Sequence, residues 1–186
     1  MGALLALELA ARLGPRVAGL GLLSPTFFYD GWNMPRFGRK LLPFAFMTPL
    51  KHVLYWRETP PYGIKCERTR AMVHAVLESR DAQAAEKVGI FRTPMVTVQQ
   101  SSLLIRTVSR SLPHVHCPLL VVHSTEDDMA SVRNAHYVTR HVSSKDVETW
   151  LIDNTYHVLT LDRRKDDVAR RVGEFFGLRA RPALAA

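Results

Sequence analysis

The stretch PLLVVHSTEDD, residues 118–128, decides how the rest of the chain is arranged. Its first half is an uninterrupted apolar run, residues 119–122, which follows a proline and ends at a polar cluster. Such a run is typical of a strand that is buried on both faces of a parallel sheet. The strand delivers Glu126, Asp127 and Asp128 to the carboxyl edge of the sheet, where open α/β sheets build their sites. We therefore expect an α/β fold with a functional site at this edge.

The next predicted strand brings a histidine to the same edge. Residues 147–152 form this strand, and His157 follows it just before a helix. An acid after one strand and a histidine after the next are two of the three members of a Ser-His-Asp triad. In a triad the histidine takes the proton of the serine and later gives it to the leaving group. The carboxylate fixes the tautomer of the imidazole and stabilises its cation.

The residues around this pair resemble a known family. The segments HSTEDDMASVRNA (residues 123–135) and YHVLTLDRRKDDV (residues 156–168) look like the C-terminal half of α/β-hydrolase carboxylesterases of the monoacylglycerol-lipase-like type. The opening MGALLALELAA is similar to the end of the G-x-S-M-G nucleophile elbow of that family and the alanine- and leucine-rich helix after it. The resemblance covers nearly the whole chain and is most specific in residues 1–25 and 113–177.

The resemblance implies a carboxylic ester hydrolase that works through an acyl-enzyme, with Asp127 as the acid and His157 as the base. It places the nucleophilic serine immediately before Met1, and it makes the backbone nitrogen of Met1 one donor of the oxyanion hole. We therefore expect a hydrolase that is truncated at its elbow and inactive as this chain alone. The alternative is a non-catalytic hydrolase-like remnant that binds a partner or a lipid-like ligand.

Several other residues compete for these roles. Glu126 and Asp128 are alternatives to Asp127, and the resemblance selects Asp127 as the first acid of the pair before Met129. Asp128 is then expected to bond the loop backbone, as aspartate often does in turns. His123 lies inside the predicted strand, where we expect a hydrogen-bonded structural histidine. The serines that could be proposed as nucleophile all lie outside a G-x-S-x-G turn: Ser24, Ser101, Ser102 and Ser131.

Residues 1–26 and 111–178 are predicted to form the core, an incomplete and mostly parallel α/β-hydrolase sheet. Its first helix should end at Gly14-Pro15, because this pair stops a helix. The remaining predicted elements of the core are a strand at residues 17–23 and helices at 131–142 and 162–176, the last ended by Gly177. Residues 179–186 are predicted to be a disordered tail.

Residues 27–110 are predicted to be a helical cap over the carboxyl edge. Residues 27–62 hold ten of the sixteen aromatic residues and five prolines, which limits helices there and argues against a place in the main sheet. Helices are expected at 68–88 and 95–110. An aromatic packing layer with no ligand role is the open alternative. We expect a pocket for a medium-length acyl ester, with lactones, acylglycerols and amides open, lined by several of Phe27, Trp32, Phe44 and Trp56.

Composition narrows the remaining function classes. The net charge of +8 would suit a nucleic-acid binder, but the basic residues are scattered among acids, so no nucleic-acid partner is expected. Glu8 and Arg12 interrupt the apolar start of the chain, which argues against a signal peptide or a membrane span. Cys66 and Cys117 show no metal-binding spacing and are expected to be free thiols in the cytoplasm. We expect no metal and no organic cofactor, and the sequence leaves the oligomeric state open.

Overall fold

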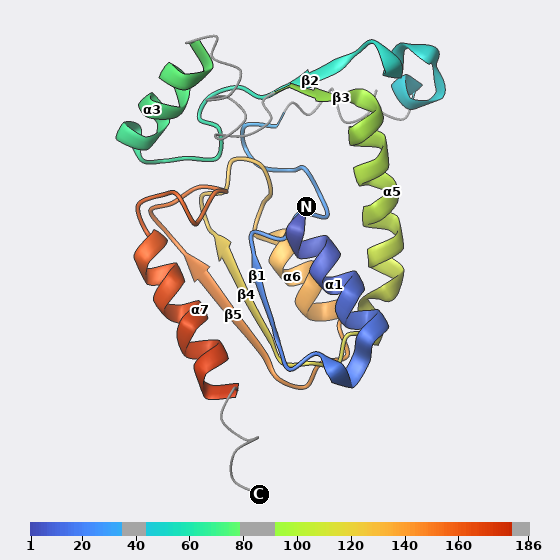
Figure 1. Cartoon of the computed structure of the whole chain (residues 1–186), viewed down its shortest axis with the longest axis vertical. Helices are drawn as coiled ribbons and strands as arrows, with labels where there is room; N and C mark the ends of the chain where they lie inside the picture. Colours follow the sequence, from blue (N-terminus) through green and yellow to red (C-terminus); the bar gives the residue numbers. More distant parts are fainter. Residues whose placement is uncertain (35–43, 79–91, 180–186) are drawn as a thin grey trace, which may run out of the picture.

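A computed structural model of the chain describes residues 1–34, 44–78 and 92–179 (Figure 1). At its centre is a parallel sheet in the order β1-β4-β5, with β1 at Leu20–Leu23, β4 at Leu119–Ser124 and β5 at Val147–Ile152. The helices are α1 (Gly2–Leu13), α3 (Glu67–Glu78), α5 (Met95–Ser111), α6 (Arg133–His141) and α7 (Lys165–Arg179), with short 3-10 turns η1 (Gly14–Arg16), η2 (Pro49–His52) and η3 (Leu112–His114).

Strand β4 is the centre of the fold because it is buried on both faces. Its six residues are all buried, and successive side chains point to opposite sides of the sheet. Leu119 and Val121 pack in one apolar cluster with residues of α1 and α6. Leu120 and Val122 pack in a second cluster with Phe175 of α7. The sheet is therefore the middle layer, with α1 and α6 on one face and α7 on the other (Figure 1), and the α/β class expected from sequence is confirmed.

The ends of several elements differ from the prediction. α1 ends at Gly14 as expected, with a φ of 54° that glycine adopts without strain. β1 begins only at Leu20, and residues 17–19 of the predicted strand belong to no helix or strand. The prediction that Gly177 ends the last helix is wrong, since α7 continues to Arg179. Arg179 is thus helical, and the rest of the predicted disordered tail lies outside the described residues.

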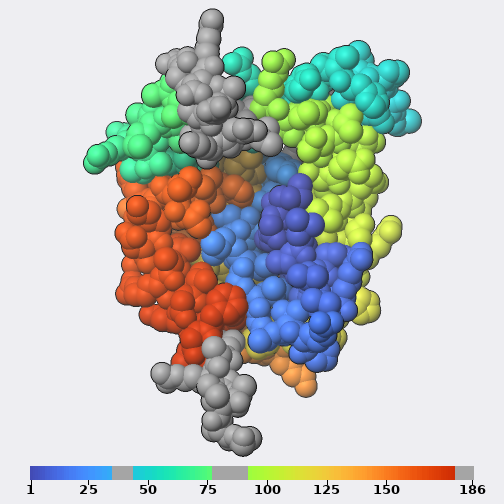
Figure 2. Space-filling model, viewed as in Figure 1, coloured from blue at the N-terminus to red at the C-terminus, as the bar shows by residue number. Residues whose placement is uncertain are grey.

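A second, small sheet lies above the carboxyl ends of the parallel strands. It pairs β2 (Tyr55–Arg57) with β3 (Arg92–Pro94) in antiparallel register and was not predicted. Figure 1 shows this sheet and α3 at the top of the molecule, and Figure 2 shows the same segments covering one end of the body. The helix predicted at residues 68–88 is observed up to Glu78, and its remainder lies outside the described residues.

α5 connects this upper layer with the sheet. It begins beside β3 and runs down the side of the molecule (Figure 1). Near its end Val108, with Leu112 of η3, joins the core cluster that contains Leu4 and Leu7 of α1. The division into a core and a cap, with a boundary at residues 110–111, stays a prediction. In the described ranges, no helix combines the length and apolar character that crossing a bilayer requires.

Candidate active site

The loop after β4, residues 125–130, holds Asp127 in a fixed position; we call it the acid loop. The carboxylate oxygen Oδ1 of Asp127 accepts hydrogen bonds from the backbone N–H groups of Met129 and Ala130, both at 2.8 Å. These donors belong to the same tight turn, so the local sequence alone orients the side chain. Asp127 is 4% exposed. Its second oxygen, Oδ2, is left to face the loop after β5.

That loop, residues 153–162, carries His157 and is called the histidine loop. Nδ1 of His157 lies 2.8 Å from Oδ2 of Asp127. A carboxylate can only accept a hydrogen bond, so the proton sits on Nδ1 and Nε2 is left as the basic nitrogen. The imidazole is 25% exposed, whereas the Asp127 side chain is fully buried. The hydrogen bond predicted from the sequence is present, and the catalytic roles of the two residues stay a prediction.

The neighbouring acids have other partners. Glu126 forms an ion pair with Lys65 and also accepts the backbone N–H of Asn154 at 2.7 Å, and these contacts lower its pKa. Oδ2 of Asp128 accepts the backbone N–H of Gly63 at 3.1 Å, so its backbone partner lies in a distant segment and not in its own loop as predicted. Burial, reinforced by the charge of Asp127, raises the pKa of Asp128.

A second histidine lies behind the acid. His123 is completely buried, and its Nε2 lies 2.8 Å from the carbonyl oxygen of Ala130 and 3.5 Å from Oδ2 of Asp127. Burial lowers the pKa of His123, and this effect is larger than the opposing ones of the Ala130 carbonyl and the Asp127 carboxylate, which raise the pKa. His123 is therefore a neutral, hydrogen-bonded structural residue, as expected from its place in the strand, and its N–H supports the position of the acid loop.

The four serines considered as alternative nucleophiles all direct their hydroxyl hydrogens elsewhere. Ser24 donates to the backbone carbonyl of His157 at 2.8 Å, and so it holds the backbone of the histidine loop instead of the imidazole. Ser101 donates to the carbonyl of Thr97 and Ser102 to the carbonyl of Val98. Ser131 donates to Oδ2 of Asp30. None of these hydroxyls donates to the His157 ring, which agrees with leaving them out of the predicted site.

The amino end of α1 lies at the same edge of the molecule as the two loops (Figure 1). The carbonyl oxygen of Met1 accepts the N–H groups of Leu4 and Leu5 at 3.0 and 3.3 Å, so Met1 forms the first turn of the helix. Burial lowers the pKa of the Met1 α-amino group, although 59% of the residue is exposed. The assignment of the Met1 nitrogen to an oxyanion hole stays a prediction.

Sequence reasoning missed the residues that attach the chain after β1 to the acid loop and to the start of α6. Oδ1 of Asn134 accepts the backbone N–H groups of Phe27 and Phe28, both at 2.7 Å, and its Nδ2 donates to Oδ1 of Asp30 at 3.0 Å. Gly31 approaches so closely that a Cβ there would lie 2.3 Å from the carbonyl oxygen of Asp128. The dipeptide Asp30-Gly31, a turn signal, was the one local hint of this contact.

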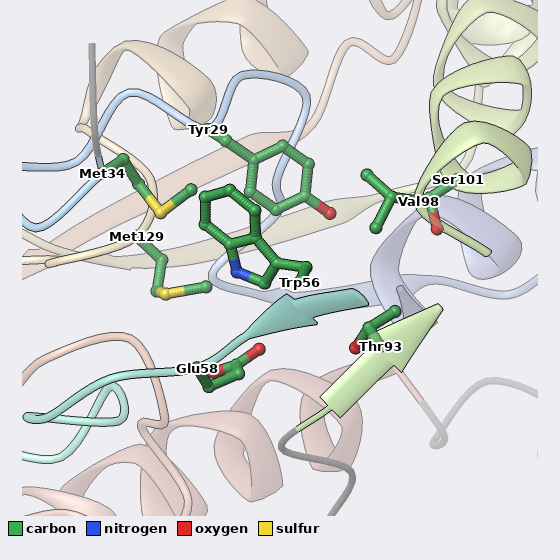
Figure 3. A pocket seen from close by; sticks show the side chains of 8 residues that line it. All are labelled: Tyr29, Met34, Trp56, Glu58, Thr93, Val98, Ser101 and Met129. Carbon is green, nitrogen blue, oxygen red and sulfur yellow. The ribbon is translucent and has the colours of Figure 1, made fainter. Parts of the chain in front are cut away.

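A small, mostly apolar cavity of about 110 Å³ lies beneath β2 and β3. Figure 3 shows the side chains of Trp56 and Glu58 among those that line the cavity. Burial raises the pKa of Glu58, with the charge of His157 opposing this shift and that of Asp128 adding to it. Glu58 in the cavity wall therefore lies close enough to the histidine and acid loops for the charges of His157 and Asp128 to affect its pKa. Its lining residues are Tyr29, Met34, Trp56, Glu58, Thr93, Val98, Ser101 and Met129.

A larger cavity of about 790 Å³ includes Asp127 and Trp32 in its wall. The predicted shared aromatic pocket is therefore wrong, because Trp56 is the one member of the predicted set that lines the small cavity. The indole N–H of Trp32 donates to the carbonyl of Glu126 at 3.0 Å. Phe27 packs in the core against Tyr137, with ring centroids 5.1 Å apart, and Phe44 is 69% exposed.

The chain is similar to several known proteins. The family described as "Serine aminopeptidase, S33" matches residues 1–164. A thermostable monoacylglycerol lipase of a Bacillus species is 32% identical over 89 residues, which are 48% of this chain and 36% of that protein. A carboxylesterase of Bacillus subtilis is 30% identical over 84 residues, 45% of this chain and 34% of that protein. The matched part thus spans about a third of these curated relatives.

Solved structures extend the likeness over most of the chain. The monoacylglycerol lipase of Paleococcus ferrophilus superposes with a TM-score of 0.72 at 13% sequence identity. The superposition covers 93% of this chain and 63% of the lipase chain. A soluble variant of the monoglyceride lipase of Saccharomyces cerevisiae, solved with a substrate analog, gives a TM-score of 0.73 at 12% identity over 95% of this chain and 62% of its own. At these identities the likeness shows a common fold.

Proposed function

Because the chain belongs to the serine aminopeptidase S33 family and has the α/β-hydrolase fold, we propose that it supplies the acid and the base of a carboxylic ester hydrolase with a Ser-Asp-His triad. Asp127 is the acid and His157 is the base. The observation that carries the proposal is the 2.8 Å contact between Nδ1 of His157 and the fully buried carboxylate of Asp127. The matched relatives, a lipase and a carboxylesterase, favour an ester over a peptide substrate.

In the proposed reaction a serine hydroxyl attacks the ester carbonyl while Nε2 of His157 takes its proton. The tetrahedral intermediate collapses when the imidazolium returns the proton to the leaving alkoxide, which gives an acyl-enzyme and the alcohol. Water, deprotonated by the same nitrogen, then releases the acid. Asp127 keeps the proton on Nδ1 throughout. The backbone donors on its Oδ1 hold the carboxylate so that Oδ2 stays at the ring.

We further propose that the nucleophile is a serine directly before Met1 in the complete protein. Two features support this position. Met1 begins the first turn of α1, and the amino end of this helix lies at the same edge of the molecule as the acid and histidine loops. In addition, the hydroxyls of the four alternative serines donate hydrogen bonds to other groups. When Met1 follows a peptide bond, its N–H is one donor of the oxyanion hole. Residues 1–186 alone are then inactive.

The substrate in this proposal is an ester with an apolar acyl group, bound under a cap formed by residues 27–110. The apolar side chains of Trp56, Met34 and Met129 in the small cavity support an apolar group. The cavity of about 110 Å³ is below the usual range for a complete ligand, so it holds only part of the substrate. A cytoplasmic location belongs to the same proposal and is supported by two free thiols, Cys66 and Cys117.

The test is an assay on p-nitrophenyl octanoate with two forms of the protein. Residues 1–186 should hydrolyse the ester no faster than buffer. A longer form, which also carries the residues encoded upstream of Met1 in the same reading frame, should be active. His157→Ala in the extended form should lower kcat by about 10⁴-fold or more. His136→Ala, in an exposed histidine of α6, is the matched control and should keep the activity. An extended form without a serine before Met1 and without activity would favour the non-catalytic remnant.

A further inference from the structure

A short piece of backbone connects the acid loop with the histidine loop. Residues 63–66, here called the bridge segment, lie between β2 and α3 in the layer above the sheet (Figure 1). On the acid side, the N–H of Gly63 donates to Oδ2 of Asp128 at 3.1 Å. The ammonium group of Lys65 forms an ion pair with Glu126 in the same loop. The bridge segment therefore contacts both neighbours of the acid Asp127.

On the histidine side, the bridge segment is held by Asp162, which is 2% exposed. The carboxylate of Asp162 accepts the backbone N–H groups of Lys65 at 2.8 Å and Cys66 at 2.7 Å. The same carboxylate accepts the backbone N–H of Tyr156 at 2.8 Å and the hydroxyl of Thr155 at 3.1 Å. One buried side chain thus joins the bridge segment to the two residues that precede His157.

The charge state of Asp162 fits this role. Burial by itself would raise the pKa of the carboxyl group, but the backbone N–H donors together outweigh burial, and the pKa lies below its ordinary value. Asp162 is therefore ionised near neutral pH, and the bonds that it accepts are the stronger, charge-assisted kind. An asparagine in its place has one acceptor oxygen and points an NH₂ group at hydrogen-bond donors, so part of these hydrogen bonds would be lost.

Gly63 contacts Val158, the residue directly after the histidine. Its carbonyl oxygen accepts the N–H of Val158 at 2.8 Å. A Cβ on Gly63 would lie 2.9 Å from Cγ2 of Val158 and 3.1 Å from Cβ of His157. Its φ of +73° is a conformation that other residues rarely adopt. Any side chain at this position therefore strains the turn and pushes on the histidine.

We propose that Gly63 and Asp162 are positioning residues that hold the histidine loop in place, so that Nδ1 of His157 stays on Asp127. The inference rests on the proposed function only in that His157 is the base there. It adds that the orientation of the imidazole depends on the layer above the sheet and not only on its acid partner. A displacement of the bridge segment should weaken the His157–Asp127 hydrogen bond while both residues remain intact.

The experiment observes this bond directly in residues 1–186, without a catalytic assay. In a chain labelled with ¹⁵N-histidine, long-range ¹H–¹⁵N spectra report the tautomer of each ring, and His157→Gln identifies the His157 signals. The unchanged chain should show His157 with its proton on Nδ1. Gly63→Ala should lose this proton signal or shift the ring toward the other tautomer. Gly177→Ala is the matched control, because a Cβ there meets no atom within 4 Å, and it should change nothing.

Asp162→Asn tests the second half of the proposal against Asp166→Asn, which removes the same charge from an exposed residue in the first turn of α7. Asp162→Asn should lose the Nδ1 proton signal and Asp166→Asn should keep it. If Asp162→Asn does not fold, Thr155→Val removes one donor from the buried set with little change in shape and should broaden the signal.

The outcomes separate the inference from the proposed function. Folded Gly63→Ala and Thr155→Val or Asp162→Asn chains that keep the unchanged His157 signal overturn the positioning role and leave the triad standing. A chain without any Nδ1 proton on His157, before substitution, overturns the Asp127–His157 pair and with it both proposals. An inactive extended protein whose spectra respond as expected overturns the esterase proposal alone.

Discussion

The acid and histidine loops and the small cavity beside them are built in opposite ways. In the loops and at the start of the adjoining α6, a few buried polar side chains each bind several backbone groups, as Asp127, Asn134 and Asp162 do. The cavity has no such centre, because its wall is assembled from side chains of four separate stretches, 29–34, 56–58, 93–101 and 129. The comparison indicates that substitutions in the loops should cost folding free energy, whereas those in the cavity should change ligand binding and leave the fold nearly intact.

The largest effect is expected from Asn134→Ala. The substitution leaves the buried N–H of Phe27 and the partly buried N–H of Phe28 without their 2.7 Å partner and removes the donor to Asp30. Unsatisfied buried groups cost about 1–3 kcal/mol each, so the free energy of unfolding should fall by roughly 3 kcal/mol. Urea unfolding of residues 1–186 measures this loss. Gln100→Ala, on an exposed position of α5, is the control, and a loss below about 1 kcal/mol for Asn134→Ala would contradict the prediction.

The loops were also the part of the molecule that the sequence could predict. β4, β5 and the Asp127–His157 pair depend on signals within a few residues: a short apolar run, a polar cluster after it, and a motif that resembles a family. The turn that holds Asp127 is equally local, because its donors are two and three residues away.

The contacts that the sequence did not predict are those made over long separations. Asn134 binds the backbone 106 and 107 residues away, and Gly63 binds Asp128 across 65 residues. Composition also failed to assign the aromatic residues, because it does not say which way a ring points. Trp32 and Trp56 come from the same aromatic segment, yet they line different cavities.

This difference between the two tryptophans gives a prediction for the cavity. Trp56→Ala removes an apolar wall of the small cavity and should weaken binding of 1-octanol about tenfold, roughly 1.4 kcal/mol, because less apolar surface is buried. The free energy of unfolding should change by less than about 1 kcal/mol, since Trp56 is only partly buried. Trp32→Ala is the matched control and should leave octanol affinity unchanged. Isothermal titration calorimetry measures both, and equal effects of the two substitutions would place the ligand elsewhere.

The smallest effect is expected from Glu58→Gln, and it depends on pH. Burial raises the pKa of Glu58, and the neighbouring Asp128 carboxylate adds to this shift. A raised pKa means that the folded state favours the protonated form, so Glu58 costs stability as the pH rises from the ordinary glutamate pKa of about 4.3 through the raised value. Glutamine does not ionise, so the variant should be more stable than the unchanged chain at pH 7.

At pH 4 both states of the unchanged chain carry largely protonated Glu58, and the difference between the two chains should shrink toward zero. At pH 7 it should stay below about 1 kcal/mol, because Glu58 is partly exposed and water screens its charge. Urea midpoints at the two pH values measure it. Glu174→Gln is the control, since this exposed carboxylate lies 3.7 Å from Arg171 and should give no gain. A Glu58→Gln chain that is less stable at pH 7 would mean that the carboxylate is held by a favourable partner, and the cavity would then resemble the loops in its construction.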